Sequence, residues 1–206
     1  MEKQLIISIG REFGSAGHAI GEELAGRFKI GLYDHNIMDL IAARKSGNAT
    51  SLLLFDETPK PKFFSRTVRG FNNSPEDIIS EMQFDFLEER ADAGESFVVV
   101  GRCGEHVLKN YECMVSIFVL ADYDKKHERI MKKYNLSSRE AHNMIKIKDK
   151  KRKMYHNYHC DLHWGDSRGY DLCINSSKLG IEGTADVIEA YIRELFGIVY
   201  KSEEQD

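Results

Sequence analysis

Short unbroken apolar runs alternate along the chain with stretches in which apolar residues recur every three or four positions. An unbroken run of this kind is typical of a buried parallel strand, whereas the wider spacing is typical of a helix that packs by one face. The runs predict strands at 4–9, 31–34, 97–101, 115–121 and 170–175. The wider spacing predicts helices at 17–28, 36–46, 75–93, 124–134, 137–158 and 181–196, with a helical turn at 104–108.

Several predicted helices carry a clear start signal or a clear apolar face. Ser137-Ser138-Arg139-Glu140 predicts a capping box, and Ser74-Pro75-Glu76-Asp77 predicts a capped start with proline at the first helical position. In the last helix we expect an inward stripe of Val187, Ile188, Tyr191, Ile192 and Leu195. In the helix at 36–46 we expect a stripe of Ile37, Leu40, Ile41 and Ala42.

Strands that alternate with helices predict an α/β fold in which a parallel sheet is covered on both faces. With 206 residues, 42% of them apolar, the chain can bury the core of one domain that spans residues 1–206. The pattern weakens between residues 47 and 75, where we expect an excursion from that core.

Composition narrows the classes of partner. The net charge of −4 gives no global basic field, so we expect no nucleic-acid partner and only a local site for a polyanion. Neither a signal segment nor an apolar run of membrane-spanning length occurs, so we expect no membrane partner and a cytoplasmic protein. The four cysteines form no C-x-x-C pair, which favours reduced thiols.

The first predicted strand enters the first helix through a glycine-rich loop. Gly10, Gly14 and Gly17 allow backbone N–H groups to turn toward an anion, and the helix start adds free N–H groups and a positive dipole end. The loop therefore predicts a phosphate site, with Arg11 as a cation inside it. The Walker pattern G-x-x-x-x-G-K-[ST] is absent, and Gly17 or His18 stands in the lysine's place. A tight turn that binds nothing is the alternative.

Two other polar residues lie at predicted strand ends, Asp34 after the second strand and Arg102 after the third. Ligands of parallel sheets bind beyond the carboxyl ends of the strands, so we expect both side chains to meet the glycine loop. A guanidinium group suits a phosphate because it binds two oxygens at once. As alternatives, Arg102 pairs with Glu105, and Asp34 caps the helix that follows it.

The stretch 146–153 of the long helix is strongly basic. Lys148 and Arg152 are four residues apart and share a face, and Arg168 follows after a short loop. Cations so placed can offset the charge that develops in phosphoryl transfer, while a solvated basic face is the alternative.

Four residues of zinc-ligand type follow the basic stretch: His156, His159, Cys160 and His163. Their spacing matches no standard zinc finger. We therefore assign no metal site to them.

Four stretches carry a family resemblance: Gly10-Arg11-Glu12-Phe13-Gly14-Ser15-Ala16-Gly17, Val100-Gly101-Arg102-Cys103, Asp149-Lys150-Lys151-Arg152-Lys153-Met154-Tyr155, and Trp164-Gly165-Asp166 leading to 170–175. Together they resemble the cytidylate-kinase-like family of P-loop nucleoside monophosphate kinases, over nearly the whole chain. The resemblance implies a three-layer P-loop kinase fold, with a five-stranded parallel sheet and helices on both faces. It also implies a core of 1–46, 76–145 and 170–200, an acceptor flap at about 47–75 and a lid at about 146–169.

The same resemblance implies ATP and Mg²⁺ as cofactors and small nucleotides as ligands. The residues it places at the donor phosphates are Gly10, Arg11, Gly14, Ser15, Ala16, Gly17 and His18. It places Asp34 and Arg102 at the acceptor, and it takes Arg152 from the lid, with Lys148 or Lys151 nearby. We also expect Arg168 among the lid contacts, from its place a short loop away. The expected catalytic groups are Arg152, Arg102 and His18, of which His18 can donate to phosphate when protonated or is a surface residue of the first helical turn.

This chain departs from the family pattern in its loop. Ala16-Gly17-His18 stands where the family commonly reads Gly-Gly-Arg, so both the lysine and an arginine that replaces it are missing. Ser15 or a water would then serve at the magnesium position, and no acid precedes Arg102 on its strand.

Two functions are consistent with these features. The first is ATP-dependent phosphoryl transfer to a nucleoside monophosphate, cytidylate-like, or to a similar small acceptor. The alternative is a non-catalytic module that retains the kinase fold and binds nucleotide or phosphate. A dinucleotide-binding protein is disfavoured because the first turn has no G-x-G-x-x-G.

Overall fold

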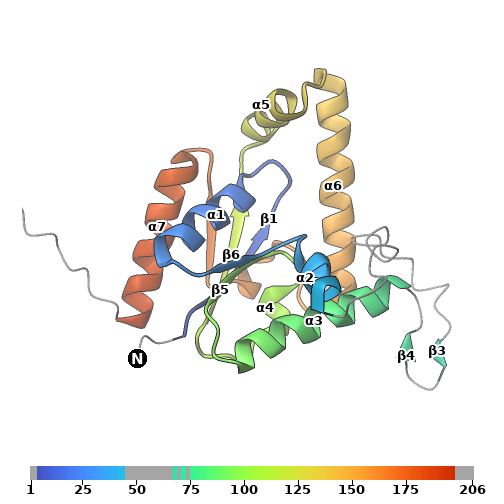
Figure 1. The fold of residues 1–206 in the computed structure, drawn as a ribbon. Coiled ribbons are helices and arrows are strands. Elements are labelled where there is room, and N and C mark those ends of the chain that lie inside the picture. Colours follow the sequence, from blue (N-terminus) through green and yellow to red (C-terminus); the bar gives the residue numbers. More distant parts are fainter. Residues whose placement is uncertain (1–3, 45–66, 69–70, 73–74, 198–206) are drawn as a thin grey trace, which may run out of the picture.

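A parallel five-stranded sheet forms the centre of the computed structural model, which describes residues 4–44, 67–68, 71–72 and 75–197 (Figure 1). The strand order is β2-β5-β1-β6-β7, and every neighbouring pair is parallel. The strands of the sheet are β1 (Ile6–Arg11), β2 (Gly31–Tyr33), β5 (Phe97–Val100), β6 (Met114–Leu120) and β7 (Leu172–Asn175). The expected α/β fold with a parallel sheet is confirmed.

Seven helices surround the sheet within the described residues. They are α1 (Gly17–Phe28), α2 (Ile37–Arg44), α3 (Pro75–Asp92), α4 (Gly104–Val107), α5 (Tyr123–Tyr134), α6 (Ser138–His159) and α7 (Gly180–Phe196). A short antiparallel pair, β3 (Thr67–Val68) and β4 (Phe71–Asn72), stands apart from the sheet. The rest of the expected flap lies outside the described residues.

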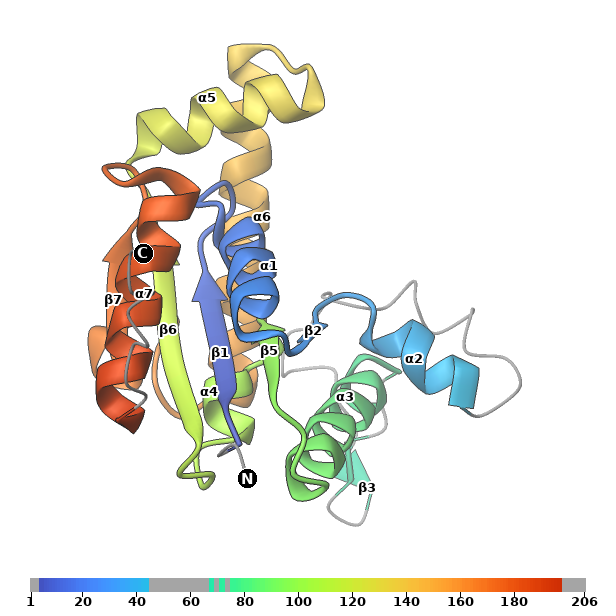
Figure 2. The same cartoon turned by 60° about the vertical axis from the view of Figure 1, so that its left-hand side comes forward.

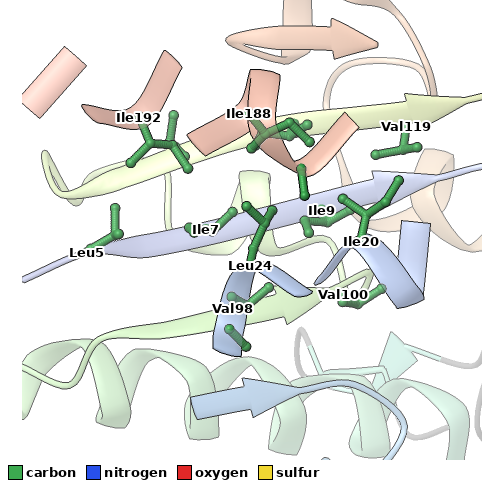
Figure 3. Close-up of a cluster of buried hydrophobic side chains, with 14 residues drawn as sticks. Leu5, Ile7, Ile9, Ile20, Leu24, Val98, Val100, Val119, Ile188 and Ile192 are labelled. Atoms are coloured by element: carbon green, nitrogen blue, oxygen red, sulfur yellow. The ribbon is translucent and has the colours of Figure 1, made fainter. Parts of the chain in front are cut away.

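Two apolar layers hold the helices on the sheet, because successive strand side chains point to opposite faces. On one face Ile7, Ile9 and Val98 pack with Leu24 of α1 and Ile188 of α7, all fully buried (Figure 3). On the other face, Ile6 of β1 and Phe97 and Val99 of β5 are covered by α2, α3 and the segment after α4. The buried residues that cover them are Ile37, Met38, Ile41, Ile79, Phe86, Leu87 and Leu108. The sheet is thus buried on both sides, as a parallel sheet requires.

The apolar stripe of α7 is narrower than its sequence pattern predicts. Ile188 and Ile192 are fully buried, but Val187 is 42% exposed and Leu195 is 53% exposed, so the prediction that these two face inward is wrong. In α2, Leu40 is likewise exposed and Met38 is buried in its place. Apolar spacing shows that a helix has a buried face, but the neighbouring elements decide how wide that face is.

Helices α5 and α6 form a hairpin whose turn lies beyond the carboxyl ends of the strands, and α6 then runs back beside the sheet to the level of α4 (Figures 1 and 2). A separate apolar cluster joins Phe13 of the glycine loop to Ile130 of α5 and to Ala141 and Ile145 of α6. The hairpin is therefore packed directly on the loop after β1. None of the described helices is both long and apolar enough to cross a membrane.

The start of α6 has the capping box that the sequence predicts. The Ser137 hydroxyl oxygen accepts a bond from the Glu140 amide, while the Glu140 carboxylate accepts the Ser137 amide at 2.9 Å. Ser137→Ala is expected to lower the free energy of unfolding by about 1 kcal/mol, because an N–H group of the first turn loses its acceptor. Ser137→Asn supplies another good cap and should recover most of the loss in urea unfolding. Equal stability of all three proteins would contradict a role for this cap.

Candidate phosphate-transfer site

Left-handed backbone at two positions shapes the loop between β1 and α1. Gly14 has φ +85° and Ala16, which precedes the first turn of α1, has φ +66°. Alternation of right- and left-handed residues turns successive N–H groups into one concavity, which is suited to an anion. The first turn of α1 contains no acidic residue, so no carboxylate of its own competes for the free N–H groups and the positive helix end.

Hydrogen bonds to its carbonyl groups fix this loop. The Ser15 hydroxyl donates to the Glu12 carbonyl at 2.9 Å, the Ser176 hydroxyl donates to the Ser15 carbonyl at 2.6 Å, and Arg129 of α5 donates to the Gly14 carbonyl. Ser15 is fully buried, so its side chain is committed to the loop and is turned away from solvent. The amides of Glu12, Phe13 and Ser15 are also bonded, to the Val119 carbonyl, the Asp149 carboxylate and the Glu12 carbonyl. An anion would therefore meet mainly the N–H groups at the start of α1.

Arg11 folds back over the loop to which it belongs. A Cβ atom built on Gly17 would lie 2.6 Å from Arg11 Cβ, and one built on Gly101 would lie 2.1 Å from Arg11 Nη1. Both glycines therefore leave the room that the arginine side chain occupies. Gly17 is one of the two positions where a Walker lysine would stand. In this protein the Cβ and Cγ atoms of Arg11 occupy the space beside Gly17.

Arg102 follows β5 on an unusual piece of backbone. Gly101, Arg102 and Cys103 have φ values of +80°, +60° and +54°, and for the two non-glycine residues this left-handed conformation is strained. The Arg102 side chain is only 5% exposed. A strained and buried arginine at a strand end indicates that its direction is fixed by the surrounding structure.

The long helix α6 brings two charged side chains to the loop, one turn apart. Arg152 Nη1 donates to the Arg11 carbonyl at 3.2 Å, and its guanidinium lies 5.4 Å from the centre of the Phe13 ring. Asp149 accepts the Phe13 amide at 2.6 Å and lies 3.3 Å from Lys126 Nζ. Part of the expected lid is thus docked on the loop.

Asp34, at the end of β2, accepts bonds from several directions. His18 Nε2 lies 2.5 Å and His35 Nδ1 lies 2.8 Å from its Oδ2 atom, while the Asn36 amide donates to Oδ1 at 2.9 Å. Burial by itself raises the pKa of Asp34, but the bonds from Asn36 and His18 outweigh burial and place that pKa below its usual range. The carboxylate is therefore charged at neutral pH, and together with the two imidazoles it offers ligand atoms within 4.8 Å of one another.

These groups border one cleft of about 560 Å³. Asp34 follows β2, Arg102 follows β5 and the glycine loop follows β1, and these three strands are neighbours in the sheet. Arg152 comes from α6. The cationic side chains along its wall are Arg11, Arg102, Arg129, Lys133 and Arg152. The cleft thus combines backbone N–H groups with a high density of positive charge, a combination suited to a polyphosphate.

Other residues that we expected at the site do not border this cleft. Lys148 and Lys151 are exposed. Gly10 borders a cavity of about 30 Å³ whose wall it shares with Arg11, Arg102 and Arg152. Arg168 is exposed, is paired with Asp166, and borders a different cavity. Their expected roles at the phosphates stay predictions.

The structure also adds cations that the sequence analysis did not single out. Lys126, Arg129 and Lys133 of α5 are three and four residues apart, so they share the face that meets the loop. Lys126 is 9% exposed in its side chain and lies 3.0 Å from a Glu12 carboxylate oxygen. The regular spacing of these cations was the available signal, but spacing alone does not tell toward which neighbour a helix face turns.

A second group of reactive side chains lies between α4 and the end of α6. His156 Nε2 is 2.6 Å from Glu105 Oε1, so Glu105 pairs with a histidine of α6. Burial lowers the pKa of His156, but the neighbouring Cys160 and Glu105 outweigh it and raise that pKa to about 10. The Cys103 thiol and His156 lower the pKa of Cys160 to about 7. His159 and His163 are not part of this cluster.

Comparisons with known proteins agree with this architecture. Residues 6–178 match the model of the cytidylate kinase-like family. A crystal structure of an uncharacterized protein from Eubacterium ventriosum is 37% identical, with 92% of this chain and 98% of that chain covered and a TM-score of 0.73. A shikimate kinase from Bacteroides thetaiotaomicron is 13% identical, with 94% and 99% covered and a TM-score of 0.53, which shows a shared fold alone. No curated protein matches the sequence.

Proposed function

Because the chain belongs to the cytidylate kinase-like family, as its motifs predict, we propose that it transfers the terminal phosphoryl group of ATP to a nucleoside monophosphate, cytidylate-like, or to a similar small acceptor. The observation that carries the proposal is the meeting of Arg11, Arg102 and Arg152, from three separate segments, in one cleft at the glycine loop. A site for phosphoryl transfer needs mainly correct positioning and cations around the transferred group.

The donor phosphates would lie at the N–H groups of the start of α1, beside the loop. Arg11 would supply the cation that a Walker lysine supplies elsewhere, since its stem occupies the space over Gly17. Its guanidinium reaches Gly101, beside Arg102, so it would act where the donor and acceptor phosphates meet. A planar guanidinium can hold two phosphate oxygens at once, which a lysine cannot do.

Arg102 and Arg152 would act on the acceptor and on the transferred group. In the transfer an acceptor oxygen forms a bond to the terminal phosphorus while the bond from that phosphorus to ADP breaks. An acceptor phosphate is largely ionised at neutral pH, so it needs no general base. The chain must instead hold two anions together and offset the charge on the transferred oxygens, for which buried cations are effective.

Magnesium would be bound mostly by the phosphates and by water. Mg²⁺ prefers oxygen ligands, and the carboxylates that border the cleft are Glu12, Glu22 and Asp34. Glu12 is already engaged by Lys126 and by the Ala121 amide, and the Ser15 hydroxyl bonds to its own loop. Asp34 is engaged by His18, His35 and the Asn36 amide, and Glu22 lies 3.3 Å from His18. Each of the three carboxylates thus has partners already, so phosphate and water oxygens would hold most of the ion, which would neutralise part of the phosphate charge.

The alternative function, a nucleotide-binding module without turnover, has an observation in its favour. The Asp149 carboxylate already occupies the Phe13 amide of the loop, and the lysine and the Ser/Thr ligand of the Walker pattern are absent. Such a module would bind nucleotide through the same arginines but would not release ADP.

One experiment separates the two functions. Purified protein is supplied with ATP, Mg²⁺ and each nucleoside monophosphate in turn, and ADP release is followed by a coupled assay. Release that depends on one acceptor supports the kinase. Stabilisation against thermal unfolding by ATP, with no ADP release for any acceptor, supports the binding module. If neither ADP release nor stabilisation is observed, both functions are contradicted.

A further inference from the structure

A second cavity, of about 490 Å³, opens on the part of the molecule where α4 meets the end of α6. Figure 1 shows the carboxyl end of α6 at the level of α4. None of the described residues that border this cavity also borders the cleft at the glycine loop. The cavity is therefore distinct from that cleft, although Glu105 and His156 of its wall also border the cavity of about 30 Å³ that Arg11, Arg102 and Arg152 border.

Three side chains of different chemistry converge at its wall. One ligand atom from each of Glu105, His156 and Cys160 lies within 4.8 Å of the other two. His156 and Cys160 are four residues apart at the end of α6, so they share a face, and Glu105 comes from α4. A carboxylate, an imidazole and a thiol in such a group are the ligand types that zinc prefers.

Burial and hydrogen bonding point to a missing partner at this place. The residue His156 is 7% exposed, and its Nδ1 atom has no hydrogen-bond partner among the described residues. A buried polar nitrogen without a partner is unfavourable, and such atoms in native proteins usually have an ion or a water to satisfy them. Since Nδ1 makes no bond, presenting it to an ion by a turn of the ring would cost only the contacts that Nε2 makes with Glu105 and Tyr170.

We propose that Glu105, His156 and Cys160 bind a divalent thiophilic cation of the zinc type. Ligand atoms about 2.0–2.3 Å from a tetrahedral ion lie roughly 3.3–3.7 Å from one another, so the present separations need to change by only about 1 Å. The Glu105–His156 contact of 2.6 Å must open, and the others lie within the 4.8 Å limit. Three protein ligands leave a fourth position, on the side of the 490 Å³ cavity.

The surroundings favour zinc over the hard cations. The Cys103 thiol lies next to Cys160 and lowers the pKa of its thiol, so it is a neighbour that can support a ligand sulfur. Magnesium and calcium prefer sites made only of oxygen atoms, whereas a thiolate selects zinc and similar ions. The ion would join the end of the lid helix to α4, which begins two residues after Arg102.

The test uses full-length protein without an affinity tag, stripped of metal and kept reduced with a phosphine, and titrated with Co²⁺ and then Zn²⁺. We expect one Co²⁺ per chain, a near-ultraviolet band from thiolate ligation, and loss of the band when Zn²⁺ displaces Co²⁺. Mutation of a residue that only orients a metal ligand weakens metal binding about 10- to 100-fold. Cys160 would be a ligand itself, so Cys160→Ser should weaken binding at least about 100-fold. Glu105→Gln should weaken binding in the same direction.

Cys113→Ser and Cys173→Ser are the matched controls, because both cysteines are also free and partly exposed. Both variants should keep the band, and Zn²⁺ should raise the unfolding temperature of the native chain and of both controls but not of Cys160→Ser. Absence of a thiolate band, or a band that survives Cys160→Ser, would overturn the metal site. The measurement requires neither ATP nor turnover, so its outcome is independent of the proposed kinase activity.

Discussion

Arg102→Ala is expected to lower kcat/KM for ADP release by about 10³-fold or more, the effect of an arginine that stabilises a transferring phosphoryl group. The side chain is buried, its backbone is held in a left-handed conformation, and it borders the same cleft as Arg11 and Arg152. Arg102→Lys keeps the charge but loses the planar fork, so we expect it to recover only part of the activity. The coupled assay, run at several acceptor concentrations, measures both variants.

Arg139→Ala is the matched control for this prediction. This variant also replaces an arginine by alanine, but at the exposed start of α6, away from the cleft. It should therefore leave kcat/KM unchanged. Thermal unfolding of each variant separates a loss of activity from a loss of fold. If the protein only binds nucleotide, Arg102→Ala should lower nucleotide affinity by calorimetry instead. A variant with native activity and native affinity would remove Arg102 from the site.

The position of the cleft could be predicted from the sequence because it follows from topology. Asp34, Arg102 and the glycine loop each follow a predicted strand, and parallel strands bring their carboxyl ends to one edge. The order β2-β5-β1, which makes the three neighbours, was not available from local patterns. It depends on how the chain crosses over the sheet between strands, and the long stretch between β2 and β5 gives no local sign of that.

The side chains that come from α5 and α6 were harder to predict. A basic stretch at 146–153 indicates a charged helix, but only Arg152 of its basic side chains borders the cleft, while Lys148 and Lys151 are exposed. The direction of each side chain is set by the packing of α5 and α6 on Phe13, a contact between distant segments.

The cluster at α4 shows the same limit more clearly. The sequence offers His156, His159, Cys160 and His163 as neighbours, yet the fold selects two of them and adds Glu105, which is 51 residues from His156. His159 instead packs among aromatic rings of Phe84, Tyr155 and Tyr158, and burial lowers its pKa to about 4. The spacing of residues along one helix indicates which side chains could form a cluster. Which of them do so depends on the partner that another element brings to them.

Gly101→Ala should impair both stability and activity. Gly101 has φ +80°, where an alanine is strained by about 1–2 kcal/mol, and its new Cβ would lie 2.1 Å from Arg11 Nη1. The flexible end of Arg11 is the group that can yield, so we expect the guanidinium to leave its place beside Arg102. A misplacement of about 1 Å at such a site can lower the rate about 10²-fold, and we expect a loss of that size in kcat/KM.

Gly26→Ala is the control, because no atom lies within 4 Å of a Cβ at this position of α1. Alanine is favoured over glycine inside a helix, so this variant should be more stable by about 0.5–1 kcal/mol in urea and fully active. A double-mutant cycle then tests the cause of the Gly101 effect. If displacement of Arg11 is the cause, Gly101→Ala in an Arg11→Ala background should lower kcat/KM no further. Additive losses would mean that Gly101 acts independently of Arg11, through the backbone of Arg102.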